Sequence, residues 1–408
     1  MTIYKLGEIA TVEISGVDKK IKDGEIPVKL CNFVDVYYNW AITSDMEKEF
    51  MEVTARPNEI ERFKLKRGQV ALTKDSETRF DIGIATYIAD DFDNVILGYH
   101  NTLITPSPEK LSGKYLNALL HTDYARTYFA NNASGSGQRY ALSVDALNNF
   151  PVPLIPLAEQ ERIGDIFSSI DQKIALNRAI NDNLEAMAKQ LYDYWFVQFD
   201  FPDENGRPYK SSGGAMVYNE QLKREIPDGW SDSTLSEICV MYQPQTIGTD
   251  LLLPNGVYRV YGANGIVGKY DQYNHEDSEI AMACRGNSCG VVNRTMPYSW
   301  ITGNAMVLQM KDKGVSNEYI KQSVSYMNIS GAISGSGQPQ LTRENLNIVK
   351  CLKPAHNVLL SFSQLIEPIV TAQLHIIEEN DKITKLRDEL LPLLMNGQVS
   401  VNYHLSDD

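Results

Sequence analysis

One pentapeptide, Ser-Gly-Ser-Gly-Gln, occurs twice in the chain, at residues 134–138 and 334–338. In both places a tyrosine-containing amphipathic stretch precedes it and a long stretch with heptad spacing follows it. Flanking positions repeat as well, because Leu142 corresponds to Leu341 and Pro156 roughly to Pro354. Self-similarity of this kind indicates a duplicated structural unit. The sequence therefore predicts one fold written twice, in a chain of 408 residues that can hold two domain cores.

The two units also begin alike. Residues 6–12 (Leu-Gly-Glu-Ile-Ala-Thr-Val) resemble residues 235–241 (Leu-Ser-Glu-Ile-Cys-Val-Met), which places the start of the second unit near Gly229. Short apolar runs bounded by Gly, Asp and Asn predict strands at 70–73, 82–88, 257–261, 279–283 and 305–308. A single helical stretch is expected over 111–131. The predicted fold class is α+β, with two similar mixed α/β domains.

Two long stretches carry heptad patterns typical of helices that pack together. From Ile163, one predicted core position recurs every seven residues to 191, and the other runs from Ile166 to 194. From Phe362 the same frame runs to 390, with the second position from Leu365 to 393. The order domain, helix, domain, helix predicts an antiparallel coiled-coil pair that separates the domains by roughly 47 Å about a pseudo-twofold axis. A coiled coil that serves dimerisation of any kind remains the alternative.

Polar residues and prolines interrupt these helices. Asn177 and Glu379 occupy seam positions, where they either fix the register or lie at a solvated edge. Pro368 is expected to disturb the first turns of the second helix, and Pro392 to help end it. The resulting predicted boundaries are 1–155 for the first domain, 156–198 for the first helix, 199–228 for a loop-rich connection, 229–354 for the second domain and 355–398 for the second helix.

Composition excludes several classes of protein. No apolar run approaches the length of a membrane helix, so we expect a cytoplasmic protein without membrane contact. The five cysteines include no Cys-x-x-Cys pair, so neither a disulfide framework nor a zinc site is indicated, and no metal or cofactor is expected. The net charge of -14 argues against a chain that binds nucleic acid by bulk charge, but it allows a locally basic face.

Catalytic motifs are also missing from the sequence. Residues 286–290 fit the Gly-x-Ser-x-Gly pattern of a nucleophile elbow, but the extended residues that follow favour a turn between two strands. A P-loop pattern fails at Tyr270, and neither His-Glu-x-x-His nor the Asn-Pro-Pro-Tyr motif of amino-methyltransferases occurs. We therefore expect a non-catalytic chain whose chemistry resides in partner subunits.

The chain resembles a specificity subunit of a Type I restriction-modification system over essentially its whole length. The stretches that carry this resemblance are the first pentapeptide leading to 151–156 (Pro-Val-Pro-Leu-Ile-Pro), then 159–163 (Glu-Gln-Glu-Arg-Ile), 194–202 (Tyr-Trp-Phe-Val-Gln-Phe-Asp-Phe-Pro) and 226–230 (Ile-Pro-Asp-Gly-Trp). The second helix departs from the pattern, since 355–357 (Ala-His-Asn) stands where the first has 157–161. The resemblance implies two target-recognition domains that recognise a bipartite site on double-stranded DNA. It also implies modification (methyltransferase) and restriction (endonuclease) subunits as partners.

Candidate DNA contacts are basic and amide side chains near the predicted strand ends and the pentapeptides, because such groups bind phosphates, guanine or adenine. They are Lys66, Arg67, Lys74, Arg79, Gln138 and Arg139 in the first unit and Arg285, Asn287, Arg294, Gln338, Gln340 and Arg343 in the second. The glycine-rich pentapeptides either bring backbone amides close to phosphates or form plain tight turns. Two other functions stay open at this point: a coiled-coil scaffold with tandem domains that bind something other than DNA, and a self-contained DNA-modifying enzyme.

Overall fold

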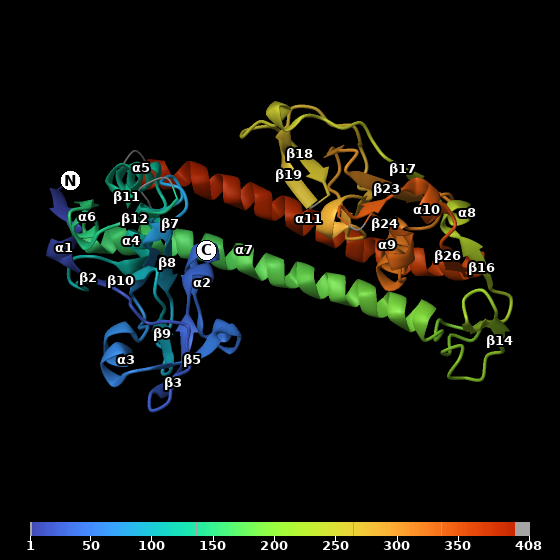
Figure 1. Ribbon diagram of the computed structural model, residues 1–408, viewed down its shortest axis with the longest axis horizontal. Helices are drawn as coiled ribbons and strands as arrows, with labels where there is room; N and C mark the ends of the chain where they lie inside the picture. The colour runs from blue at the N-terminus through green and yellow to red at the C-terminus, as the bar shows by residue number, and fades with distance from the viewer. Residues whose placement is uncertain (1, 136–137, 264, 336, 396–408) are drawn as a thin grey trace, which may run out of the picture. The chain divides into compact units, whose positions relative to one another are not determined.

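The computed structural model describes residues 2–135, 138–263, 265–335 and 337–395 and forms two compact units. Unit 1 contains the described residues up to 177 and those from 379 onward, and unit 2 contains 178–378. Each unit combines β-sheets with packed helices (Figure 1), and the long helix α7 (Leu157–Tyr192) connects them. The predicted mixed α/β class with two domains and a long helix between them is confirmed.

The core of unit 1 is built on a five-stranded sheet. Its strands, in pairing order, are β2 (Ala10–Ile14), β10 (Asn101–Pro106), β6 (Val70–Thr73), β8 (Ala85–Ile88) and β4 (Ala41–Ile42). A smaller sheet holds β5 (Met51–Ala55), β3 (Ile26–Cys31) and β9 (Val95–Leu97). The helices of this unit are α1 (Leu6–Ile9), α2 (Phe33–Tyr38), α3 (Pro57–Phe63), α4 (Gly113–Leu120), α5 (Asp123–Asn132) and α6 (Val144–Asn148).

Unit 2 repeats the central part of this sheet with the same antiparallel neighbours. Its strands, in pairing order, are β17 (Cys239–Tyr242), β23 (Ala305–Met310), β20 (Ile280–Ala283) and β21 (Val292–Arg294). A second sheet holds β19 (Gly265–Tyr270), β18 (Tyr258–Gly262) and β22 (Trp300–Ile301). The helices are α8 (Leu235–Ile238), α9 (Asn317–Tyr326) and α10 (Arg343–Asn347).

Equivalent hydrogen bonds join the beginning of each unit to its end. In unit 1, β1 (Thr2–Lys5) pairs with β13 (Pro151–Leu154), and in unit 2, β16 (Ser231–Thr234) pairs with β26 (Lys350–Lys353). The buried Tyr115 donates its hydroxyl to the carbonyl of Pro153 at 2.7 Å, as Tyr319 does to Leu352 at 2.8 Å. The predicted duplication is therefore present at the level of individual bonds.

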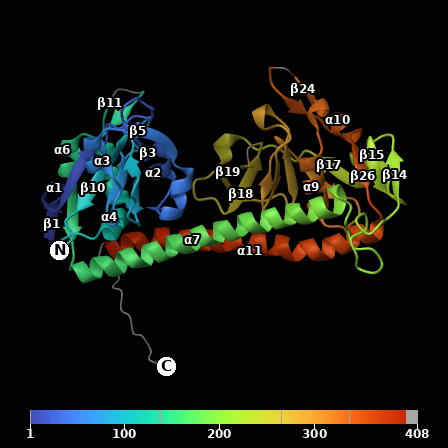
Figure 2. The ribbon, with the colours of Figure 1, turned by 90° about the horizontal axis from the view of Figure 1, so that it is seen from below.

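The long helices run antiparallel in each unit (Figure 2). In unit 1, the start of α7 shares a core with the end of α11 (His356–Met395), because Ile163 and Leu394 belong to one buried cluster. In unit 2, the π-helical turn that follows α7 meets the start of α11, where the rings of Trp195 and Phe362 lie 5.8 Å apart. The heptad repeat correctly predicted this pairing within one chain.

The predicted seam is correct at one heptad position and wrong at the other. The second core position lies four residues after the first, at Phe167 and Ile174, instead of three residues after it. The residues predicted for it are at least partly exposed: Ile166 is half-buried against the unit 1 core, and Ile180 is 39% exposed. The same shift occurs in α11, where Ile366 is buried and Leu365 is 53% exposed. Apolar pairs such as 166–167 and 365–366 fit both frames, so the sequence did not distinguish them.

Asn177 is buried in the seam. Its amide donates to the Glu379 carboxylate at 2.7 Å and to the Asn380 side chain at 2.9 Å, while Lys173 pairs with Glu379 at 3.3 Å. Hydrogen bonds from Asn177 and then Lys173 lower the pKa of Glu379. For Asn177, the structure favours a role in fixing the register over a place at a solvated edge. Its buried amide can make these hydrogen bonds only when the two helices are aligned in this one register.

Several local predictions need correction. Helix α11 continues through Pro368, whose exposed position leaves the freed carbonyl open to water, whereas Pro392 lies in the last described turn of the helix, which is described to Met395. The stretch 111–131 forms two helices, because the Thr122 hydroxyl accepts a hydrogen bond from the Ala125 amide and starts α5. Strand β8 covers only the last part of 82–88.

The segment between the two predicted domains is partly structured, and the long helices extend close to their predicted ends. The segment 199–228 contains a hairpin of β14 (Met216–Asn219) and β15 (Arg224–Pro227), and it buries Phe199 and Phe201 in the unit 2 core. A π-helical turn, Asp193–Val197, continues α7 almost to the predicted 198. Of the predicted second helix, residues 396–398 lie outside the described residues.

The position of the seam predicts different effects for the same Ile→Ala substitution at two positions of α7. Ile174→Ala should lower the free energy of unfolding by about 2–5 kcal/mol, because it removes a side chain that is 4% exposed. Ile180→Ala should cost less than about 1 kcal/mol, since that side chain already faces water. Urea unfolding of both variants checks this, and equal losses would contradict the observed frame.

Candidate nucleic-acid interface

A small sheet brings the first pentapeptide next to the end of strand β6. Strand β7 (Asp75–Ser76) directly follows β6 and pairs with β12 (Tyr140–Ala141), which pairs with β11 (Ser134–Gly135). The pentapeptide thus belongs to a hairpin, of which residues 136–137 lie outside the described residues. Residues more than sixty positions apart in the sequence meet here, since Asp75 faces Ala141.

Asp75 organises a cluster of basic side chains at this place. Its carboxylate, in a residue 8% exposed, lies 2.9 Å from the Lys74 amine, 2.5 Å from His100 Nδ1 and 3.4 Å from the Arg139 guanidinium. Burial opposes ionisation of Asp75, but hydrogen bonds from Lys74 and His100 outweigh it and lower its pKa. One carboxylate therefore orients two permanent cations and an imidazole, which leaves a positive surplus.

The other unit 1 candidates divide into two groups. The guanidinium of Arg79 lies 5.2 Å from the ring centre of Tyr140, next to this cluster, and Gln138 is exposed beside Arg139. Lys66 and Arg67 are exposed in the turn before β6. Because β6 separates that turn from Lys74 by four residues, roughly 13 Å of strand, the structure does not bring these two side chains into the cluster.

Unit 2 builds the same junction with different side chains. The Leu341 amide donates to the Cys284 carbonyl at 2.9 Å, as the Leu142 amide does to the Lys74 carbonyl. Arg285 then faces Gln340 of the second hairpin, β24 (Ile333–Ser334) and β25 (Gln340–Leu341), as Asp75 faces Ala141. The exposed candidates around this junction are Arg285, Asn287, Gln338, Gln340 and, at the start of α10, Arg343. Residue 336 of the second pentapeptide lies outside the described residues.

Two features of unit 2 have structural explanations. Residues 286–290 form the turn between antiparallel strands β20 and β21, as the sequence predicted in preference to a nucleophile elbow.

Arg294 lies apart from the exposed candidates, because its guanidinium pairs with the fully buried Glu318 at 2.6 Å. Lys321 bridges Glu318 to Glu185 of α7, so this network fixes α9 against the long helix.

Unit 1 attaches its domain to the long helix through the buried Gln160 and through an exposed ion pair, Lys114–Asp165, at 2.7 Å. The buried Gln160 of α7 accepts a hydrogen bond from the Ser112 amide at 2.9 Å and donates to the carbonyls of Lys110 and Ile155 at 3.0 and 2.9 Å. All of its partners are backbone groups. Unit 2 has the equivalent uncharged bond, from the Ser316 amide to the Ser363 hydroxyl of α11 at 2.8 Å, and adds the buried Glu318–Lys321–Glu185 network with α7.

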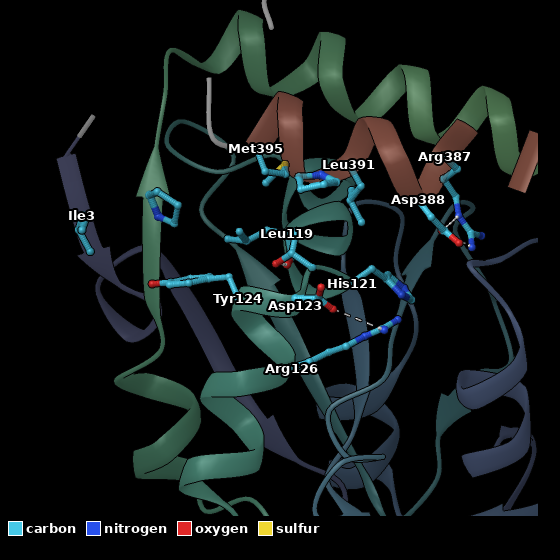
Figure 3. A pocket seen from close by; sticks show the side chains of 13 residues that line it. Ile3, Leu119, His121, Asp123, Tyr124, Arg126, Arg387, Asp388, Leu391 and Met395 are labelled. Atoms are coloured by element: carbon cyan, nitrogen blue, oxygen red, sulfur yellow. Dashed lines mark hydrogen bonds and ion pairs between the residues drawn. The ribbon is translucent and has the colours of Figure 1, made fainter. Parts of the chain in front are cut away.

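Unit 1 also contains a pocket of about 530 Å³, between the α4–α5 junction and the end of α11 (Figure 3). Its charged groups pair among themselves, with Asp123 3.9 Å from Arg126 and Asp388 2.9 Å from Arg387. His121 lines it, stacks on Trp40 with ring centres 4.3 Å apart, and bonds the Ala85 carbonyl through Nε2. The candidate DNA contacts lie elsewhere among the described residues, so this pocket is not part of the interface.

Sequence inspection missed Asp75, His100 and Tyr140. Asp75 is adjacent to a candidate lysine, but its role depends on the pairing of β7 with β12, which no local pattern encodes. His100 has a φ of 72°, a left-handed conformation that is uncommon for residues with a side chain and is found enriched at functional sites. Nothing in the sequence marks this backbone geometry.

Within the described ranges, no group of three His, Cys, Asp or Glu side chains is arranged to hold a metal. No helix in the same ranges is long and apolar enough to cross a membrane.

Comparison with known proteins identifies the class. Residues 1–186 and 227–351 match the Type I restriction modification DNA specificity domain, so the chain belongs to this family. The specificity subunit of the Type I restriction enzyme HindI from Haemophilus influenzae is 23% identical, covering 82% of this chain and 87% of that protein. The MjaIX specificity subunit from Methanocaldococcus jannaschii is 22% identical, covering 98% and 93%.

A solved structure agrees with the fold. The S subunit of a Type I restriction-modification system from M. genitalium superposes with a TM-score of 0.57 at 15% identity, covering 96% of this chain and 95% of that one. The chain is thus a DNA specificity subunit, a non-catalytic recognition component, as the resemblance implied. The alternatives of an unrelated scaffold and of a self-contained enzyme are not favoured.

The buried environment of His121 makes a prediction about acid stability. Burial lowers the pKa of His121 to about 4, against 6.5 in an unfolded chain. Between these values the unfolded chain binds a proton that the folded chain does not, so acidification from pH 6.5 to 4 should destabilise unit 1. We expect a loss of about 2 kcal/mol, below the full linkage value because the ring borders an open pocket.

The matched variant is His121→Gln, which keeps a hydrogen-bond donor but cannot titrate. Chemical denaturation at a series of pH values should show a shallower loss of stability for this variant than for the wild type. Identical pH profiles would show that His121 is already accessible to protons in the folded state.

Proposed function

We propose that each unit recognises one half of a bipartite target on double-stranded DNA, through the face where a pentapeptide hairpin meets the strand end after β6 or β20. Residues 1–155 and 229–354 are the two target-recognition domains, and α7 and α11 are the spacer helices. The modification and restriction subunits supply the chemistry in the assembled enzyme. The chain would work in the cytoplasm, where the cellular DNA of a bacterium or archaeon lies.

The observation that carries this proposal is conserved backbone geometry combined with divergent side chains. Both junctions use the same amide-to-carbonyl bond of 2.9 Å, from Leu142 to Lys74 and from Leu341 to Cys284. At equivalent strand positions, however, unit 1 has Asp75 and unit 2 has Arg285. Two copies of one scaffold with different polar groups at the same place can recognise two different base sequences.

The electrostatics of the first face fit a nucleic acid despite the net charge of the chain. Lys74 and Arg139 are held within 3.4 Å of one buried carboxylate, which preorganises their positions before DNA arrives. Preorganised cations lose less side-chain entropy on binding than free surface lysines. A DNA phosphate can then neutralise this surplus positive charge by accepting charge-assisted hydrogen bonds from Lys74 and Arg139.

The function is tested with the assembled complex of this chain and its modification subunits. Methylome sequencing of cells with and without the chain gives the modified sequence, and a binding assay on that duplex measures selectivity. We expect a two-part motif that disappears without the chain, and salt-dependent, selective binding of that motif. A complex that modifies or binds DNA without sequence selectivity would contradict the proposal.

The cationic cluster makes a prediction of its own. Lys74→Ala should weaken binding to target and non-target duplexes alike and lower the slope of log affinity against log salt by about one, as loss of a phosphate contact does. Lys19→Ala, an exposed lysine of the same unit outside the cluster, is the control and should leave the slope unchanged. An unchanged slope for Lys74→Ala would show that the Lys74 side chain does not contact DNA phosphates.

A further inference from the structure

Phe80 is an exposed aromatic residue on the loop between β7 and β8. Its side chain is 83% exposed, so it contributes little to the core of unit 1. Both of its neighbours in the chain are held in place: the guanidinium of Arg79 lies over the ring of Tyr140 at 5.2 Å, and the Asp81 carboxylate accepts a hydrogen bond from the Tyr37 hydroxyl at 2.8 Å. The ring is therefore presented outward by a loop that is fastened on both sides.

The surroundings of this ring identify what it can meet. The loop continues directly from β7, where Asp75 holds the basic cluster of Lys74, His100 and Arg139. A cationic surface of this kind attracts the phosphates of a duplex and leaves neighbouring side chains to face the grooves. An apolar ring at such a place needs an apolar partner on the DNA.

An intact duplex offers one apolar group in its grooves, the C5-methyl group of thymine in the major groove. The faces of the bases are covered by stacking, and exposing them costs a few kcal/mol for each step. The corresponding turn of unit 2 carries the exposed Asn287 instead of an aromatic residue, a side chain suited to adenine. The two units thus present different chemistry from equivalent turns.

We propose that Phe80 is a specificity-determining residue of unit 1, which recognises thymine in the target by contact with its methyl group. This inference rests on the proposed function, because it requires that unit 1 faces DNA through the β7–β12 junction. It adds a base identity to a face that is otherwise defined by its charge.

The experiment uses uracil, which pairs as thymine does but lacks the methyl group. The assembled complex with modification subunits is bound to the duplex found by methylome sequencing, and to copies in which uracil replaces thymine in one half or in the other. The wild type should bind one of these copies roughly fourfold more weakly, the value of the single methyl group that Phe80 contacts.

Three variants make the result specific. Phe80→Ala should bind the thymine and uracil duplexes equally, and Phe80→Leu, which keeps an apolar side chain, should retain part of the preference. Ile21→Ala is the matched control, since this residue is 75% exposed in unit 1 on a different loop and should keep the wild-type preference.

Each other outcome overturns the inference. If Phe80→Ala keeps the preference for thymine, another residue recognises the methyl group. If it weakens both duplexes equally, the ring acts as a wedge or a general contact. A target with no A·T pair in either half has no methyl group to recognise. If the wild type selects no duplex at all, the proposed function itself is contradicted. This outcome can be told apart from those that contradict only the role of Phe80.

Discussion

The fold depends on two long helices, α7 and α11, each of which contributes to both hydrophobic cores. Helix α7 buries Ile163 and Phe167 in unit 1 and Ala188 and Tyr192 in unit 2. An apolar stripe with alternating spacings of four and three residues keeps the same face of the helix inward along its length. Substitutions on this stripe therefore affect the core of a whole unit, whereas the opposite face of the helix tolerates polar side chains.

Duplication explains how two different recognition faces can arise from one scaffold. The bonds that place each hairpin against its strand end come from backbone amides and carbonyls, as between Leu341 and Cys284. Backbone bonds do not depend on the identity of the side chains. Asp75 and Arg285 can consequently differ in charge at equivalent positions while the local geometry stays the same.

The sequence was sufficient to predict what depends on local periodicity and repetition. It gave the duplicated units, the strands β6, β20 and β23, and the two antiparallel helices. The second seam position was wrong because Ile166 and Phe167 are both apolar, so that only packing decides which one turns inward. Pro368 of α11 was misjudged because the cost of a proline depends on whether the freed carbonyl can reach water.

The candidate site was predictable only in part. Lys74 and Arg139 were found by residue type, but their convergence needs a strand pairing across more than sixty residues. The anchoring carboxylate of Asp75 and the left-handed backbone of His100 depend on that same tertiary contact. Charge and composition therefore indicate candidate residues, while the pairing of strands determines which of them act together.

The different attachments of the two domains affect how this chain can be recombined with its relatives. Gln160 holds the first domain through backbone groups, which any homologous domain with the same main-chain path would provide, and the Lys114–Asp165 ion pair beside it is exposed rather than buried. The second domain carries Glu318 and Lys321, whose buried charges require Glu185 on the long helix. A domain transplanted into the second position must bring or find a matching set of ions, since one unpaired buried charge is strongly destabilising. Modular exchange is thus easier at the first position than at the second.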